Sequence, residues 1–263
     1  MPDQVATRRS ICADLETLGL ERGDAVLAHA ALRKVGPILG GPDALIDALL
    51  DVIGPEGTLL GYCDWQMPEE IQTRPDLRDD IPPFDPASSR SMRENGSFPE
   101  LLRTRPGTLR SANPGASCTA IGGRAAWFVA DHPLDYGYGP DSPFGKLVAT
   151  GGKTLLIGAP RDTMTLLHHA EQMADIPNKR VVRFEAPILV DGKKVWRWFE
   201  EYDTANPPEG LPEDYFKTIV TEFLDSGRGR TGSIGHAPSV LVRADEIVPF
   251  AVDWLESRFR ATQ

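Results

Sequence analysis

Apolar residues along this chain occur in two kinds of segment, short unbroken runs and longer stretches with helical spacing. The unbroken runs are typical of strands buried on both faces of a sheet. They occupy residues 24–29, 57–62, 116–121 and 154–157. Helical spacing is clearest at residues 5–19, where Ile11, Leu15 and Leu18 form one stripe and Gly19 follows as a C-cap. Strands that alternate with amphipathic helices predict an α/β protein.

Further helices are predicted between and after these strands. They fall at residues 43–53, 98–104, 125–130, 144–150, 164–173, 213–226 and 244–260. Pro42 suits the first turn of the helix at 43–53. Asp162 or Thr163 is expected to cap the helix at 164–173.

The C-terminal part is richer in strands. Residues 181–185 and 187–190 precede Asp191-Gly192, which is a strong signal for a two-residue hairpin, and residues 195–199 would pair across it. Residues 207–212 are interpreted as a linker, and residues 232–238 as a glycine-rich turn.

Residues 63–97 differ from the rest of the chain because they are rich in Pro, Asp, Glu and Ser and show no long apolar period. A long insertion without regular structure is usually functional or disordered. Aromatic residues beside carboxylates, as at Tyr62, Asp64 and Trp65, could bind a polar, cationic ring system. A solvated surface loop is the alternative interpretation for most of these carboxylates.

Composition narrows the class of partner. The 263 residues fit one large domain or two small ones. A net charge of −10 disfavours nucleic acid as a partner and suits a cationic small molecule. The same charge could also serve solubility alone. No apolar run approaches the ~20 residues that span a bilayer. The N-terminus lacks a signal-peptide core, and three scattered cysteines suggest a reducing compartment, so a cytoplasmic protein is expected.

The strongest candidate for chemistry lies on the helix at 164–173, directly after the strand at 154–157. His168 and Glu171 are three residues apart and share one helix face. A histidine beside a carboxylate can act as a general base, although a plain hydrogen-bonded helix histidine has the same spacing. The chain has no GxSxG elbow and no HExxH motif, and the sequence cannot show whether a base lies beside Cys63 or Cys118.

A second candidate site, for binding phosphate groups, follows the strand that ends at His29. Arg33 and Lys34 come directly after this strand, and a glycine-rich run then leads into the helix at 43–53. Backbone N–H groups and a cation could together hold phosphate oxygens. The segment is neither a Walker loop nor a GxGxxG fingerprint, so an ordinary Gly/Pro turn remains the alternative.

Motifs spread over residues 25–259 carry a family resemblance. They include His29-Ala-Ala-Leu-Arg-Lys-Val-Gly-Pro37, Gly61-Tyr-Cys-Asp-Trp65, Pro83-Phe-Asp-Pro86, Arg110-Ser-Ala-Asn-Pro114, Leu134-Asp-Tyr-Gly-Tyr-Gly139, Leu166-Leu-His-His-Ala-Glu171, Pro177-Asn-Lys-Arg180 and Glu201-Tyr-Asp-Thr204. In their order and spacing the chain resembles the aminoglycoside 3-N-acetyltransferase family. It is most similar to the branch that acts on disubstituted 2-deoxystreptamine antibiotics such as gentamicin and neomycin.

The resemblance implies roles for particular residues. His168 would be the general base and Glu171 its partner, and the antibiotic amine would attack the thioester of acetyl-CoA directly. The cofactor-binding residues would be His29, Ala31, Leu32, Arg33, Lys34, Val35, Gly36, Ser111, Ala112 and Asn113. The antibiotic would contact Tyr62, Asp64, Trp65, Asp203 and Glu213. Ala31 stands where the family usually has serine, so one hydroxyl contact to the cofactor is missing.

The sequence therefore predicts a three-layer α/β/α fold with a central mixed sheet and a strand-rich C-terminal part, unlike the GCN5-type fold. Residues 1–263 would form a single domain with a substrate-loop insertion at about 63–97. The expected activity is acetyl-CoA-dependent aminoglycoside 3-N-acetylation, with no metal, no nucleic acid and no membrane partner, in a monomer or homodimer. An acetyltransferase for another small amine and an inactive polycation-binding protein are the alternatives.

Overall fold

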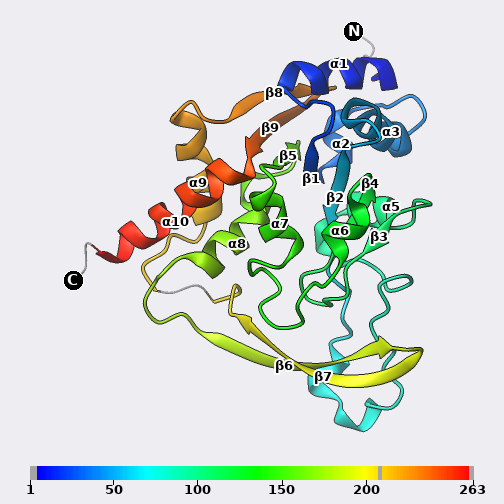
Figure 1. Cartoon of the computed structure of the whole chain (residues 1–263), viewed down its shortest axis with the longest axis vertical. Helices are drawn as coiled ribbons and strands as arrows, with labels where there is room; N and C mark the ends of the chain where they lie inside the picture. Colours follow the sequence, from blue (N-terminus) through cyan, green and yellow to red (C-terminus); the bar gives the residue numbers. More distant parts are fainter. Residues whose placement is uncertain (1–4, 207–208, 261–263) are drawn as a thin grey trace.

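A seven-stranded mixed sheet forms the centre of the molecule (Figure 1). The structure is a computed structural model and describes residues 5–206 and 209–260. In spatial order the strands are β3 (Leu109–Arg110), β4 (Cys118–Gly122), β2 (Thr58–Tyr62), β1 (Ala25–Ala30), β5 (Lys153–Ile157), β9 (Ala237–Arg243) and β8 (Arg230–Ile234). The three central strands β2, β1 and β5 run parallel, and antiparallel strands extend the sheet on both sides. The predicted mixed sheet is confirmed.

Helices cover both faces of this sheet, because successive residues of a strand point to opposite sides. Val26 and Ala28 of β1 face a core shared with α1 (Arg8–Leu18), α3 (Pro42–Ile53) and α5 (Ser97–Arg103). Ala25 and Leu27 face the other core. That core is shared with α6 (Ala125–Val129), α7 (Pro143–Ala149), α8 (Leu166–Met173), α9 (Tyr215–Asp225) and α10 (Ala244–Arg260). The predicted three-layer α/β/α arrangement is confirmed.

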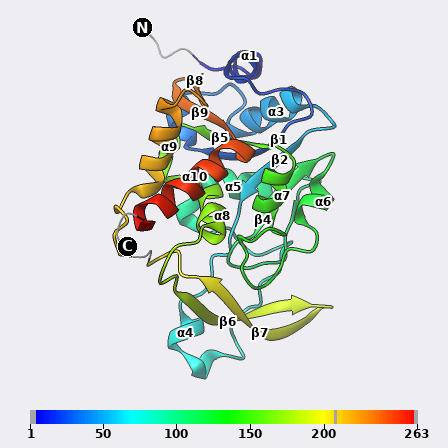
Figure 2. The ribbon, with the colours of Figure 1, turned by 60° about the vertical axis from the view of Figure 1, so that its left-hand side comes forward.

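A separate hairpin lies beyond the carboxyl ends of the central parallel strands (Figure 2). Strands β6 (Val181–Val190) and β7 (Lys193–Tyr202) pair along their whole length, and Asp191 and Gly192 form the turn with positive φ angles of 49° and 74°. The predicted hairpin is therefore confirmed, although β6 is one continuous strand where the sequence predicts two.

Residues 63–97 are built against this hairpin and contain short helical pieces, so the expectation of a structureless insertion is wrong. The pieces are α4 (Glu70–Thr73) and the 3-10 turns η1 (Pro75–Leu77) and η2 (Arg93–Asn95). Phe84 and Trp65 share a small apolar core with Ala186, Ile188 and Phe199 of the hairpin. The Phe84 backbone also hydrogen-bonds to both neighbours of Ile188, at 2.8 Å each.

Two further local predictions are wrong. Residues 232–238 are not only a turn, because they contribute to strands β8 and β9 at the sheet edge. Neither Asp162 nor Thr163 caps α8, because both lie in the 3-10 turn η3 (Arg161–Thr163) and the N-cap position is Thr165. The predicted linker at 207–212 includes residues 207 and 208, which lie outside the described residues.

Candidate active site

The carboxyl ends of the parallel strands bring the first set of candidate residues together. Strands β1, β2 and β5 end at one edge of the sheet, the usual position of sites in α/β proteins. A cleft of about 450 Å³ lies there, which we call the edge cleft. Its lining includes His29, Ala31, Tyr62, Asp64, Thr165 and His168.

His168 and Glu171 form a hydrogen-bonded dyad on α8. The Nδ1 atom of His168 lies 2.6 Å from Oε2 of Glu171, and the Glu171 side chain is completely buried. An ionised carboxylate only accepts hydrogen bonds, so a Glu171 carboxylate in this contact pairs with a proton on Nδ1 and leaves the lone pair on Nε2. The rings of Tyr138 and Phe216 each lie 4.9 Å from the His168 ring, centroid to centroid, and so fix its orientation.

The second oxygen of Glu171 is also bonded, since the hydroxyl of Tyr215 donates to its Oε1 atom. Tyr215 is the first residue of α9, and no motif in the sequence pointed to it. The dyad is thus completed by a residue 44 positions further along the chain. Sequence spacing gives no signal for a contact of this kind.

Burial changes the ionisation of two other residues in the edge cleft. It lowers the pKa of His29 to about 4, so that this imidazole is neutral at physiological pH, and Nε2 of His29 lies 3.3 Å from the Thr165 hydroxyl. Burial also raises the pKa of Asp64 to about 6, although the side-chain amide of Asn95 donates a hydrogen bond to this carboxylate. The predicted residue Trp65 is not part of the cleft lining, and its ring packs against Phe84.

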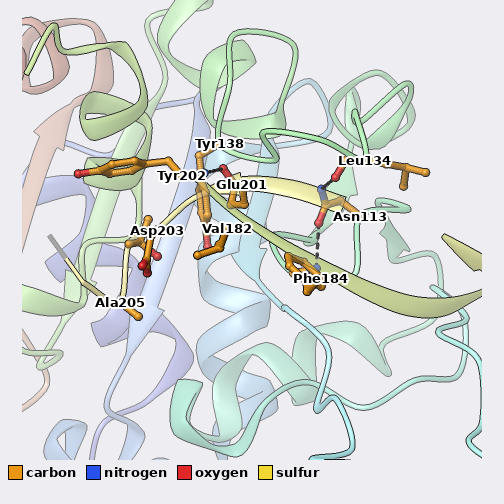
Figure 3. Close-up of a pocket in the computed structure, with 11 residues that line it drawn as sticks. Asn113, Leu134, Tyr138, Val182, Phe184, Glu201, Tyr202, Asp203 and Ala205 are labelled. Carbon is orange, nitrogen blue, oxygen red and sulfur yellow. Dashed lines mark hydrogen bonds between the residues drawn. The ribbon is translucent and has the colours of Figure 1, made fainter. Parts of the chain in front are cut away.

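A second cavity of about 190 Å³, the hairpin cavity, lies under the inner face of β6 and β7 (Figure 3). Its lining includes Asn113, Tyr138, Phe184, Glu201, Tyr202 and Asp203. Asp203 forms an ion pair with Arg180 at 2.6 Å. Glu201 accepts hydrogen bonds from the backbone N–H groups of Gly137 at 2.6 Å and Tyr202 at 3.0 Å, and its burial raises its pKa.

The dyad stands between the two cavities. Tyr62 lines the edge cleft and Tyr138 lines the hairpin cavity, and their hydroxyl groups are 2.8 Å apart. Tyr138 also packs against His168. Glu201 and Tyr138 fall within stretches that carry the family resemblance, although sequence reasoning gave neither a role.

The predicted cofactor-binding stretch includes the short helix α2 (Leu32–Val35). Arg33 and Lys34 are exposed on it, whereas Val35 is buried in the core. Gly36 follows with a φ of 87°, and a Cβ atom there would lie 2.7 Å from the His236 ring. Glycine is therefore required at this turn.

The remaining predicted site residues lie in different surroundings and do not form one cluster. Ser111 is buried, where its hydroxyl accepts a hydrogen bond from the Cys118 N–H and lies 2.8 Å from Nδ1 of His132. Ala112 is exposed, and Asn113 lines the hairpin cavity while its amide donates to the Pro133 and Leu134 carbonyls. Glu213 is exposed and lies in the lining of neither cavity as the described residues form them.

Residues 5–206 and 209–260 contain neither a cluster of metal-binding side chains nor a helix that could span a membrane. This part of the chain holds no group of three or more His, Cys, Asp or Glu side chains that could bind a metal ion. Its helices are also too short or too polar to cross a membrane.

The α/β fold thus holds a histidine–glutamate dyad close to two cavities at the carboxyl edge of its mixed sheet. Residues 27–256 match the family model described as aminoglycoside 3-N-acetyltransferase. The chain belongs to this family.

The chain matches similar proteins over most of its own length and most of theirs. Aminoglycoside N(3)-acetyltransferase III of Pseudomonas aeruginosa is 47% identical, over 93% of this chain and 91% of the relative. A solved structure described as AAC-IIIb binary with CoASH has a TM-score of 0.93 at 56% identity, and covers 97% of this chain and 98% of its own. One described as AAC-VIa bound to sisomicin has a TM-score of 0.92 at 37% identity, with 97% and 99% covered.

Proposed function

We propose that this protein transfers the acetyl group of acetyl-CoA to the 3-amino group of the 2-deoxystreptamine ring in aminoglycoside antibiotics. The observation that carries the proposal is the His168–Glu171 dyad between the edge cleft and the hairpin cavity. Similar proteins have been solved with CoASH and with sisomicin, which supports one cavity for each substrate.

The edge cleft suits the thioester arm of acetyl-CoA. Ala31 lines it at the start of α2, where the exposed Arg33 and Lys34 can attract phosphate groups. The neutral imidazole of His29 and the hydroxyl of Thr165 supply uncharged hydrogen-bonding groups inside the cleft. Ala31 has no hydroxyl, so the backbone and these neighbours provide the polar contacts.

The hairpin cavity suits a polycation. Asp203 already has a partner in Arg180, whereas Glu201 is half-buried and receives only backbone N–H donors among the contacts that the structure describes. An ammonium group beside Glu201 would offset the desolvation that raises its pKa. A charge-assisted hydrogen bond of this kind is worth about 1.5–3 kcal/mol.

The reaction proceeds by direct attack within a ternary complex. The amine nitrogen attacks the thioester carbonyl carbon while Nε2 of His168 takes one amine proton, and the C–N bond forms. The tetrahedral intermediate then collapses, the C–S bond breaks, and His168 returns its proton to the departing sulfur. Glu171 stabilises the imidazolium that exists between these steps, and its bond to Nδ1 keeps Nε2 available.

A thiol-release assay tests the proposal directly. We expect CoA release with gentamicin and with neomycin, and none with an aminoglycoside whose 3-amino group is blocked. Release with another small amine only would favour the related acetyltransferase, and tight antibiotic binding without thioester cleavage would favour an inactive polycation-binding protein.

The His168→Ala variant tests the role of the dyad. Loss of a general base lowers turnover by about 10²–10⁴-fold, and binding of both substrates should persist because other residues line the cavities. Turnover is measured by thiol release and binding by titration calorimetry. Lost antibiotic binding together with lost turnover would instead assign His168 a structural role.

A further inference from the structure

Helix α9 begins directly beside the dyad and contacts both of its members. Its first residue, Tyr215, donates a hydrogen bond to Oε1 of Glu171. Its second residue, Phe216, packs its ring 4.9 Å from the His168 ring, centroid to centroid. Both α9 residues are only 7% exposed, so water does not compete for these contacts.

We propose that Tyr215 is a positioning residue, which holds Glu171 as an ionised acceptor and thereby determines which nitrogen of His168 carries the proton. The proposal rests on the proposed function, because it assumes that His168 is the general base.

The physical reason lies in the complete burial of Glu171. A carboxylate without solvent depends on protein donors for each oxygen, and Glu171 has one donor for each, His168 on Oε2 and Tyr215 on Oε1. Without the Tyr215 hydroxyl, Oε1 would lose the donor that stabilises its charge, and Glu171 would bind a proton more readily. A protonated Glu171 donates to Nδ1, and the proton of the imidazole then lies on Nε2. That tautomer cannot accept a proton from the amine.

Other ionisable groups near the dyad do not replace Tyr215. Lys179 is close enough to interact with Glu171, but its Nζ atom donates to the Gln172 carbonyl at 3.0 Å. Tyr202 and Glu201 of β7 interact electrostatically with Glu171 and His168 respectively. Burial raises the pKa of Tyr215, followed by the effect of the neighbouring Glu171, so its hydroxyl remains a donor throughout the physiological pH range.

The Tyr215→Phe variant removes the hydroxyl and keeps the ring. We expect kcat to fall about 10- to 100-fold, the size of effect typical of a lost hydrogen bond to a charged group, with KM for both substrates nearly unchanged. The acid limb of the pH profile of kcat should move to higher pH, because a less stabilised carboxylate lets the coupled pair hold its proton longer. Tyr136→Phe is the matched control, since it removes a 2.9 Å hydrogen bond from a tyrosine to Glu200, outside the dyad. This control should leave kcat and its pH profile unchanged.

Two measurements distinguish a positioning role of Tyr215 from a merely structural one. Nitrogen-15 NMR of the wild-type protein should show His168 protonated on Nδ1, and Tyr215→Phe should increase the Nε2-protonated form. In the His168→Ala background, Tyr215→Phe should cause no additional loss of activity. An Nε2-protonated His168 in the wild type, or an equal loss in both backgrounds, would overturn the positioning role. Wild-type turnover by His168→Ala would instead overturn the proposed base, whatever Tyr215 does.

Discussion

At the residue scale, the edge cleft contains a carboxyl group whose charge opposes folding. Asp64 is 8% exposed, and burial raises its pKa from an ordinary 3.8 to about 6. Because the folded protein holds this proton more tightly than the unfolded chain, ionisation of Asp64 is unfavourable to folding. The penalty is complete above pH 6 and absent below pH 3.8. Such a charge is typical of a site that binds a ligand or handles protons.

Asp64→Asn should therefore stabilise the protein at pH 7.5, by up to about 3 kcal/mol in the free energy of unfolding. The variant can still accept the Asn95 hydrogen bond. The gain should shrink as the pH falls through 6, and urea unfolding at pH 7.5 and 4.5 measures both values. An equal gain at the two pH values would show that the charge is not the cause.

At the element scale, the hairpin and residues 63–97 form a unit with an apolar core of its own. Phe84 is 1% exposed at the centre of this core, beneath the strands whose inner face lines the hairpin cavity. Arg78 and Glu185 tie the same two segments together through bidentate hydrogen bonds of 2.6 and 2.7 Å. These contacts hold in place the strands whose inner face lines the hairpin cavity.

Phe84→Ala should raise the KM for the antibiotic about 10-fold and leave the KM for acetyl-CoA nearly unchanged. Truncation of a buried phenylalanine costs about 3–5 kcal/mol, and here the loosening is confined to the hairpin side. Steady-state kinetics with each substrate varied in turn measures the difference. Trp198→Ala is the matched control, because this aromatic ring is 59% exposed on the hairpin. A parallel rise in both KM values for Phe84→Ala would show that the two cavities are not independent.

Burial explains why some strands were predicted and the edge strand β8 was not, although the largely buried strand β9 was missed as well. Strands β1, β2 and β5 are almost wholly buried, so their unbroken apolar runs were visible in the sequence. Strand β8 is an exposed edge with the sequence Arg-Thr-Gly-Ser-Ile, which lacks such a run, so the sequence predicts a turn over its last three residues. Within the site, His168 and Glu171 were predictable because they share one helix. The Tyr215 contact was not, because it depends on how α9 packs against α8.

At the scale of the whole molecule, charge distinguishes the two substrates. The chain carries a net charge of −10, whereas aminoglycosides are polycations and acetyl-CoA is an anion. The negative electrostatic potential of the protein concentrates the antibiotic near its surface and does not attract the cofactor. Salt screens this potential over about 10 Å at 0.1 M.

Raising NaCl from about 20 to 300 mM should lower kcat/KM for the antibiotic several-fold, because screening weakens its long-range attraction. The kcat/KM for acetyl-CoA should not fall in proportion. Initial rates at matched buffer and pH measure both, and potassium sulfate at equal ionic strength controls for specific ion effects. A salt-independent kcat/KM for the antibiotic would mean that recognition depends on contacts inside the cavity alone.

The separate core beneath the hairpin also bears on how such an enzyme diversifies under selection. The dyad is carried by α8, whose residues pack in the core of the central sheet. Much of the wall of the hairpin cavity, the proposed antibiotic site, is carried by a hairpin attached through its own few apolar contacts. Apart from Glu201 and Tyr202, which interact electrostatically with the dyad, residues on the inner face of β6 and β7 are therefore expected to tolerate substitution with little effect on the acetyl-transfer chemistry. A change in the drugs to which a host becomes resistant is then expected to begin in this hairpin, and the catalytic helix is expected to change last.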